Sequence, residues 1–216
     1  MAYDLEEQEQ LASLKAWWNQ YGNLLSWLLI IVLGAYAGWN GWNYYQRSQS
    51  AQASALYDEM QKMVLAKDGA KTLRLASDIQ ARYASSSYAS MSALVAAKTA
   101  FEANDLKNTK AQLEWVVAHG SAEYQAIAKL RLAGVLLDEK AFDAALKLLA
   151  GEFLPQFAGS VADRRGDVLV AQNKTAEARA VYQAALAAMD GNNPGRQLVQ
   201  AKLDAIGGAA RAPNAA

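Results

Sequence analysis

The sequence contains no cysteine and only one histidine, His119. Without cysteine the chain has no disulfide, no thiolate metal ligand and no cysteine nucleophile. A single imidazole also excludes a metal site built from several histidines. His119 stands just before Gly120 at the end of an apolar-periodic segment, which is the usual composition of a helix stop, so we assign it a structural role. Since no group of carboxylates stands out either, we expect no enzyme, no metal and no cofactor.

Signals for β-strands and for nucleic-acid binding are weak as well. β-Branched residues are sparse, and the three prolines fall at loops, helix starts or the tail. The 21 basic residues are matched by 21 acidic ones and are interspersed with them, so no basic surface for nucleic acid is indicated. Apolar residues recur instead at helical spacing, which predicts an all-α fold.

One long stretch has no charge at all, from Ala16 to Tyr45. Its centre reads LLSWLLIIVLGAYAGW, and about 20 such residues are enough to cross the hydrocarbon core of a bilayer. Aromatic residues, which favour membrane interfaces, flank this run at both ends: Trp17, Trp18 and Tyr21 before it, and Trp39, Trp42, Tyr44 and Tyr45 at its end. We predict one transmembrane helix over 23–46, preceded by a short tail at 1–22.

The same run has one feature of a cleavable signal peptide, the A-x-A pattern at 35–37. A signal peptide needs a basic leader, however, and the first 15 residues carry four acidic side chains against Lys15. An uncleaved anchor is therefore favoured. Its orientation is not decided by charge, because Lys15 and the amino terminus on one side nearly balance Arg47 and Lys62 on the other.

Beyond the anchor, helical hairpins repeat along residues 47–206. Small residues recur 36 and then 33 positions apart at Ala97, Ala133 and Gly166. A second small position follows twelve residues later and a bulky one four residues after that; these are Thr109, Ala145 and Ala178, and then Leu113, Leu149 and Tyr182. This is the layout of tetratricopeptide repeats, whose period is 34 residues. We predict a tetratricopeptide-like solenoid, with a plain helical bundle as the alternative.

The ends of this domain are less regular. Residues 50–83 are expected to form a further, degenerate hairpin, and 197–206 a closing helix that covers the last apolar face. The final segment, 207–216, has no core-forming residue and is predicted to be a disordered tail.

Two short motifs have structural explanations. Arg165-Gly166-Asp167 matches an adhesion tripeptide, but Gly166 occupies the helix-crossing position, so we expect the triplet to be helical and unavailable. Asn173-Lys174-Thr175 matches a glycosylation sequon and also the turn of the same repeat, where Thr175 is expected to cap the next helix.

Two surfaces are candidates for binding. Gly34 and Gly38 are four residues apart on the membrane helix and would allow another helix to pack closely, with Trp39 and Trp42 beside them. The concave side of the solenoid is expected to bind extended polypeptide. Its predicted residues are Lys98, Phe101, Glu102, Leu137, Asp138, Asp167 and Val170.

The order of these parts resembles a known family. An opening MAYDLEEQEQ, then KAWWNQYGN, then one anchor and degenerate tetratricopeptide hairpins are similar to the YfgM family, the ancillary subunit of the bacterial Sec translocon. The two quoted motifs are the specific part of this resemblance. The hairpins alone are generic and are shared with cell-division coordinators, so an envelope-assembly or cell-division scaffold is the alternative.

The resemblance implies a single-pass protein in the lipid bilayer of the bacterial inner membrane. Its N-terminus would be cytoplasmic and its repeat domain periplasmic. The implied partners are the SecYEG translocon, a PpiD-type membrane-anchored chaperone, and periplasmic chaperones or secreted client proteins. The family has no catalytic residues to transfer to this chain.

Overall fold

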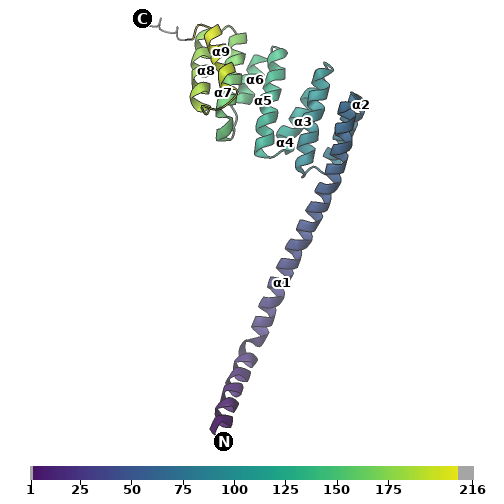
Figure 1. Ribbon diagram of the computed structural model, residues 1–216, viewed down its shortest axis with the longest axis vertical. Coiled ribbons are helices and arrows are strands. Elements are labelled where there is room, and N and C mark those ends of the chain that lie inside the picture. Colours follow the sequence, from purple (N-terminus) through teal and green to yellow (C-terminus); the bar gives the residue numbers. More distant parts are fainter. Residues whose placement is uncertain (1, 209–216) are drawn as a thin grey trace. The chain divides into compact units, whose positions relative to one another are not determined.

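The computed structural model describes residues 2–208, with side chains from residue 9 onward. Within that part every regular element is a helix, which confirms the predicted all-α class (Figure 1). The helices are α1 (Ala2–Leu65), α2 (Gly69–Arg82), α3 (Ser87–Glu102), α4 (Leu106–His119), α5 (Ala122–Asp138), α6 (Phe142–Leu149), the 3-10 turn η1 (Pro155–Phe157), α7 (Ala158–Ala171), α8 (Thr175–Ala188) and α9 (Arg196–Ala205).

The chain divides into two compact units, residues 1–51 and 52–216, and each is described by itself. The first unit is the N-terminal part of α1. Its large apolar side chains are exposed along the helix, for example 66% for Ile31 and 69% for Trp39. Only 6% of its most apolar 18-residue window is buried, so this is not the core helix of a soluble domain. The helix is long and apolar enough to cross a membrane.

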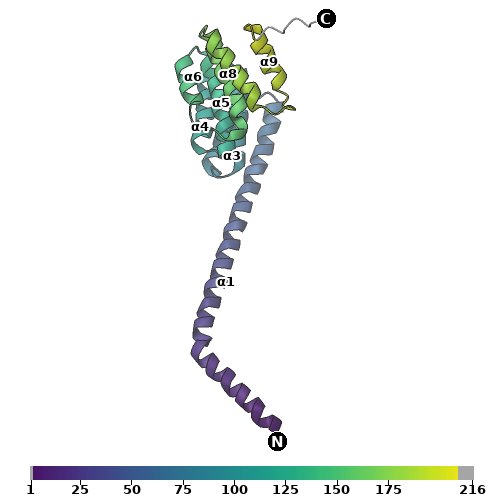
Figure 2. The ribbon, with the colours of Figure 1, turned by 90° about the vertical axis from the view of Figure 1, so that its left-hand side faces the viewer.

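Helix α1 is bent in its N-terminal part, drawn in purple (Figure 2). Glycine and serine favour such bends, and both are present here. Ser26 donates its hydroxyl hydrogen to the Gly22 carbonyl at 2.8 Å, and the Trp18 indole packs on Gly22. The helix nevertheless continues without a break through residues 23 and 46, so the backbone does not mark the ends of the predicted membrane span.

The described part of the second unit contains four helical hairpins, followed by α9. They are the C-terminal end of α1 with α2, then α3 with α4, α5 with α6, and α7 with α8. The hairpin expected from 50–83 is therefore present, since Met60 of α1 shares a buried cluster with Ala76 and Ile79 of α2. Successive hairpins also pack on one another, which confirms the tetratricopeptide-like arrangement.

The four hairpin turns have the same backbone geometry. Each contains a non-glycine residue in the left-handed region, with φ between 56° and 62°; these residues are Lys67, Asn104, Lys140 and Asn173. The next residue in each case donates its N–H to a carbonyl five positions earlier, which satisfies the end of the first helix. That same residue then caps the second helix.

This geometry corrects one prediction. Thr175 is the first residue of α8 and not its N-cap, which is Lys174. The left-handed residue Asn173 places position 174 where Asp68 and Asp105 stand in the first two hairpins. Those aspartates accept hydrogen bonds from the N–H groups of Lys71 and Asn108, whereas Lys174 has no side-chain acceptor to offer. The predicted helical placement of 165–167 is confirmed, because all three residues lie in α7.

The second-helix small positions are buried as predicted. Thr109, Ala145 and Ala178 are at most 2% exposed, and Thr72 occupies the same place in the first hairpin. The two threonines fit because each hydroxyl donates to the carbonyl of its capping aspartate at 2.8 Å. Their polar groups are therefore satisfied without contact with water.

The crossing positions are matched in size within each hairpin. The pairs are Met60 with Ala76, Ala97 with Leu113, Ala133 with Leu149, and Gly166 with Tyr182. In the first hairpin the large residue is on the first helix, and in the other three it is on the second. Each pair therefore places one large and one small side chain at the crossing, as close packing requires.

Helix α9 covers the last hairpin. It packs on α8, with Val199 and Leu203 buried in the same cluster as Tyr182. This confirms the closing helix expected at 197–206. Of the tail predicted at 207–216, only Gly207 and Gly208 belong to the described residues.

Candidate functional site

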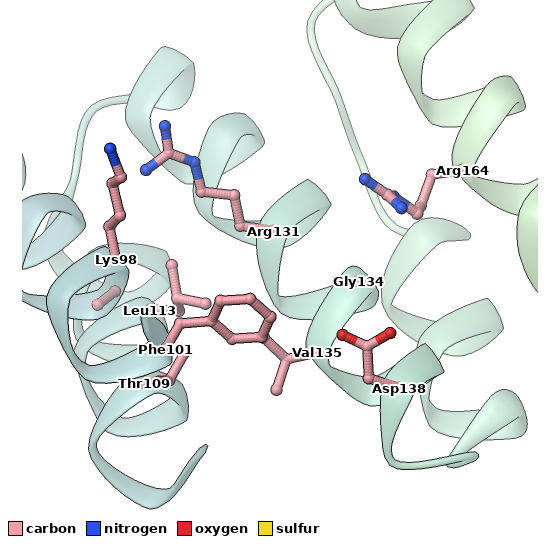
Figure 3. A pocket seen from close by; sticks show the side chains of 10 residues that line it. Lys98, Phe101, Thr109, Leu113, Arg131, Gly134, Val135, Asp138 and Arg164 are labelled. Atoms are coloured by element: carbon pink, nitrogen blue, oxygen red, sulfur yellow. The ribbon is translucent and has the colours of Figure 1, made fainter. Parts of the chain in front are cut away.

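A hollow of the second unit lies between α3, α4, α5 and α7 (Figure 3). Its volume is about 400 Å³. The first helices of three successive hairpins supply most of its wall, because their exposed faces point to the same side of the repeat array. The lining residues are Ala97, Lys98, Phe101, Thr109, Leu113, Arg131, Gly134, Val135, Asp138 and Arg164.

The floor of this hollow is apolar. Leu113 and Val135 belong to the buried core between the second and third hairpins. Phe101 lies above them and its ring reaches from α3 toward Val135 of α5 (Figure 3). Its side chain is 46% exposed, although a phenylalanine is normally buried. The floor therefore offers an aromatic surface to a bound apolar group.

Charged groups stand at the two ends of this floor. Lys98 and Arg131 lie at one end, and Asp138 and Arg164 at the other (Figure 3). Two of the cations already have acidic neighbours: Lys98 is 3.7 Å from Glu102, and Arg164 is 3.3 Å from Asp167. Gly134 leaves room for the Arg164 guanidinium, whose Cζ would lie 3.7 Å from a Cβ at that position.

A second polar cluster is internal and joins α7, α8 and α9. The Lys202 ammonium donates to the carboxylates of Asp163 and Asp167 at 2.8 and 3.0 Å. The Tyr182 hydroxyl donates to Asp167 at 2.8 Å. Burial raises the pKa of the Tyr182 phenol far above its usual range, and the hydrogen bond to Asp167 is the second cause of this shift. The groups satisfy one another, so we assign this cluster to the stability of the closing helix.

His119 has the structural position expected for it. It ends α4 and stacks on Trp115, with ring centroids 4.7 Å apart. Its Nδ1 is 2.9 Å from the Trp115 carbonyl oxygen. In the described part of the chain no three His, Asp or Glu side chains are grouped in a way that would hold a metal.

The glycines in the apolar segment of α1 leave one side of the helix open. A Cβ at Gly34, Gly38 or Gly41 would meet no other atom within 4 Å. At 100° per residue these three positions fall on one face, which extends the predicted pair by one turn. Trp39 and Trp42 are 69% and 61% exposed, so both indoles are available to lipid or to a partner.

This architecture has relatives among known proteins. The family model described as "Tetratricopeptide repeat-like domain" matches residues 15–208. A protein of Neisseria gonorrhoeae named "Ancillary SecYEG translocon subunit" is 34% identical over 208 residues, which is 95% of this chain and all of that relative. The chain belongs to this family.

Other relatives of the same name support the assignment. The protein of Haemophilus influenzae is 30% identical over 94% of this chain and 99% of its own length. That of Escherichia coli is 30% identical over 82% of this chain and 86% of its own length. No solved structure matches the chain at a significant level. The match covers the apolar helix as well as the hairpins, so the family relationship is not one of repeats alone.

The hollow of this family member contains three of the seven residues predicted for its concave face: Lys98, Phe101 and Asp138. The other four lie outside it. Glu102 is exposed beside Lys98, Leu137 packs into the core between the third and fourth hairpins, Asp167 joins the internal cluster, and Val170 packs against the core around Tyr182.

Sequence reasoning missed Arg131, Gly134 and Arg164. Residues one repeat apart, such as Phe101, Leu137 and Val170, do not line one common hollow. The hollow instead lies between neighbouring hairpins, and one face of α5 forms part of its lining. The helical spacing of Arg131, Gly134, Val135 and Asp138 on that face was the available signal.

Proposed function

We propose that this protein is a non-enzymatic ancillary subunit of the Sec translocon, anchored in the bacterial inner membrane by α1. The single observation that supports this most strongly is similarity over 94–95% of the chain, anchor included, to relatives named for that role. The N-terminal segment is cytoplasmic and the hairpins are periplasmic. There they help to pass secreted proteins to periplasmic chaperones, including a PpiD-type chaperone in the same membrane.

Tethering explains how a modest binding site would be effective. A hollow of about 400 Å³ contacts only a few side chains, so its affinity for extended polypeptide is expected to be low. An anchor beside the channel raises the local concentration of the hairpins around an emerging chain, which compensates for weak binding. No reaction is required of the protein in this role.

Association with the translocon is assigned to the glycine face of α1, defined by Gly34, Gly38 and Gly41. A photoreactive phenylalanine analogue at Ile30, one helical turn before Gly34, should form crosslinks to translocon subunits in native membranes. The same analogue at Val32, on the opposite side of the helix, is the matched control. Equal crosslinking from both positions, or crosslinks only to unrelated proteins, would contradict the assignment.

The orientation has a direct test, because the chain has no cysteine to remove. Single cysteines replace two exposed residues, Ala12 before the apolar run and Ala201 in α9. A maleimide reagent that cannot cross the inner membrane should label Ala201→Cys in spheroplasts, and Ala12→Cys only after the membrane is opened. The reverse pattern would place the hairpins in the cytoplasm and exclude the proposed role.

A further inference from the structure

Two charged side chains of the hollow have no ionic partner. In the described part of the chain, Arg131 and Asp138 form no ion pair, whereas Lys98 and Arg164 each have an acidic neighbour. Both unpaired groups are on α5, seven residues apart, so their backbone positions differ by about 10.5 Å along the helix. The hollow therefore presents one free positive and one free negative group.

The floor between these two charges is apolar. Phe101 and Val135 lie between the Arg131 end and the Asp138 end (Figure 3). Among the described residues of the second unit, three large apolar side chains are exposed, those of Leu65, Phe101 and Leu198. Of these three, Phe101 is the one in the hollow. A bound group of matching chemistry would cover this ring and neutralise a charge on each side of it.

These features specify a ligand. We propose that the hollow binds an extended polypeptide segment in which an acidic and a basic residue stand on either side of a bulky apolar one. An extended chain rises about 3.3 Å per residue and alternates its side chains, so the pattern acidic–x–apolar–x–basic puts all three on one face. Its outer residues are about 13 Å apart, within reach of Arg131 and Asp138 once side-chain length is included.

The proposal rests on the proposed function in one respect, the source of the negative charge. A secreted chain that is still in transit has no free carboxyl terminus on the far side of the membrane. The carboxylate that meets Arg131 is therefore that of an aspartate or glutamate side chain. Since a peptide can lie in either direction, the reversed order basic–x–apolar–x–acidic fits equally well.

Binding of blocked peptides to the full-length protein in phosphatidylcholine nanodiscs tests this. The core sequences are Glu-Ser-Phe-Ser-Lys, Lys-Ser-Phe-Ser-Lys, Glu-Ser-Phe-Ser-Glu and Glu-Ser-Ser-Ser-Lys, each with an uncharged fluorophore and amidated at its C-terminus. Empty nanodiscs give the background. Fluorescence anisotropy should show the first peptide binding about tenfold more tightly than the second and the fourth. Equal affinities for all four would overturn the proposal.

Charge reversal gives the sharper comparison. Arg131→Glu should shift the preference to the peptide with two lysines, and Asp138→Arg to the peptide with two glutamates, by about threefold to tenfold each. Arg74→Glu changes an exposed arginine on α2, outside the hollow, and is the matched control. Unchanged far-UV circular dichroism confirms folding of all three variants. If Arg131→Glu and Asp138→Arg shift the preference no more than Arg74→Glu does, the hollow is not the site.

The outcome is separable from that of the proposed function. Loss of the charge preference together with intact crosslinking from Ile30 to the translocon would overturn this inference alone. Preserved charge preference without any translocon contact would keep the binding site and contradict the proposed function.

Discussion

Gly166 of α7 and Tyr182 of α8 fill one space between them. A Cβ at Gly166 would come within 2.3 Å of Cε1 of the tyrosine ring, closer than real Cβ contacts allow. The Tyr182 hydroxyl is held by Asp167, and Asp167 is held by Lys202 of α9. The tyrosine ring therefore has little freedom to move away. The close approach of α7 and α8 depends on the absence of a side chain at Gly166.

Gly166→Ala is expected to lower the free energy of unfolding of the hairpin domain by about 1–3 kcal/mol, as overpacking does. Gly134→Ala is the matched control, because its Cβ would meet its nearest neighbour at 3.7 Å, an ordinary contact. That control should be neutral or stabilising by up to about 1 kcal/mol, since alanine favours a helix. Chemical denaturation of the full-length protein in detergent, followed by circular dichroism, measures both.

A size exchange should rescue the overpacked variant. Adding Tyr182→Leu to Gly166→Ala recreates the alanine–leucine pairs seen at Ala97 with Leu113 and Ala133 with Leu149. The double variant should then be more stable than the sum of the two single changes predicts, by about 1 kcal/mol or more. Additive losses would show that the two residues do not compete for the same space.

These crossing pairs also show how far the sequence could be interpreted. The register of the last three hairpins followed from small and bulky residues at fixed offsets, because close packing restricts both positions. The first hairpin escaped a firm assignment because its sizes are exchanged, with Met60 on the first helix and Ala76 on the second. A sequence pattern that expects the small residue on the first helix and the large one on the second does not detect a pair in which these two positions are exchanged.

The candidate site could be predicted only in part. Lys98, Phe101 and Asp138 were found because helical periodicity exposes them on the first helices of their hairpins. Arg131 and Arg164 were missed because the hollow depends on how neighbouring hairpins pack. Thr175 was misplaced as a cap by one residue, since the left-handed turn at Asn173 is not encoded by glycine.

Acid should destabilise the hairpins through the two aspartate caps. Hydrogen bonds from the backbone N–H groups of Lys71 and Asn108 lower the pKa values of Asp68 and Asp105 below the ordinary 3.8. Because the folded pKa is the lower one, this stability is present above pH 3.8 and is lost as the pH falls through the folded value.

The variant with both Asp68→Asn and Asp105→Asn tests this. Asparagine also caps helices but does not titrate, so the unfolding midpoint of the variant should depend less on pH below about 4 than that of the unaltered protein. Thermal unfolding at a series of pH values measures the difference. Parallel curves for the two proteins would show that other carboxylates dominate the acid response.

Lys202→Met should loosen the closing helix. It leaves Asp163 and Asp167 partly buried without their shared cation, which should cost about 1–3 kcal/mol. Lys147 is an exposed lysine of α6 that forms no ion pair in the described part of the chain, so Lys147→Met should change the stability by less than about 0.5 kcal/mol. Faster amide hydrogen exchange confined to α9 is the expected signature, and uniform loosening of all hairpins would contradict it.

Replacing Gly34 and Gly38 together by leucine should weaken lateral helix contacts. The added side chains fill the open face without lowering apolar character, so membrane insertion is preserved. Tyr36→Leu, on the opposite face, is the control. Recovery of membrane partners with the tagged protein should fall severalfold for the glycine variant alone. Unchanged recovery would remove these glycines from the partner interface.

Whether this protein is a translocon subunit is tested most directly by affinity purification of the tagged full-length protein from native membranes in mild detergent, followed by quantitative mass spectrometry. SecY, SecE and SecG should be recovered in near-stoichiometric amounts together with a membrane-anchored periplasmic chaperone. Their absence, with cell-division or cell-wall proteins recovered in their place, would contradict the proposed role.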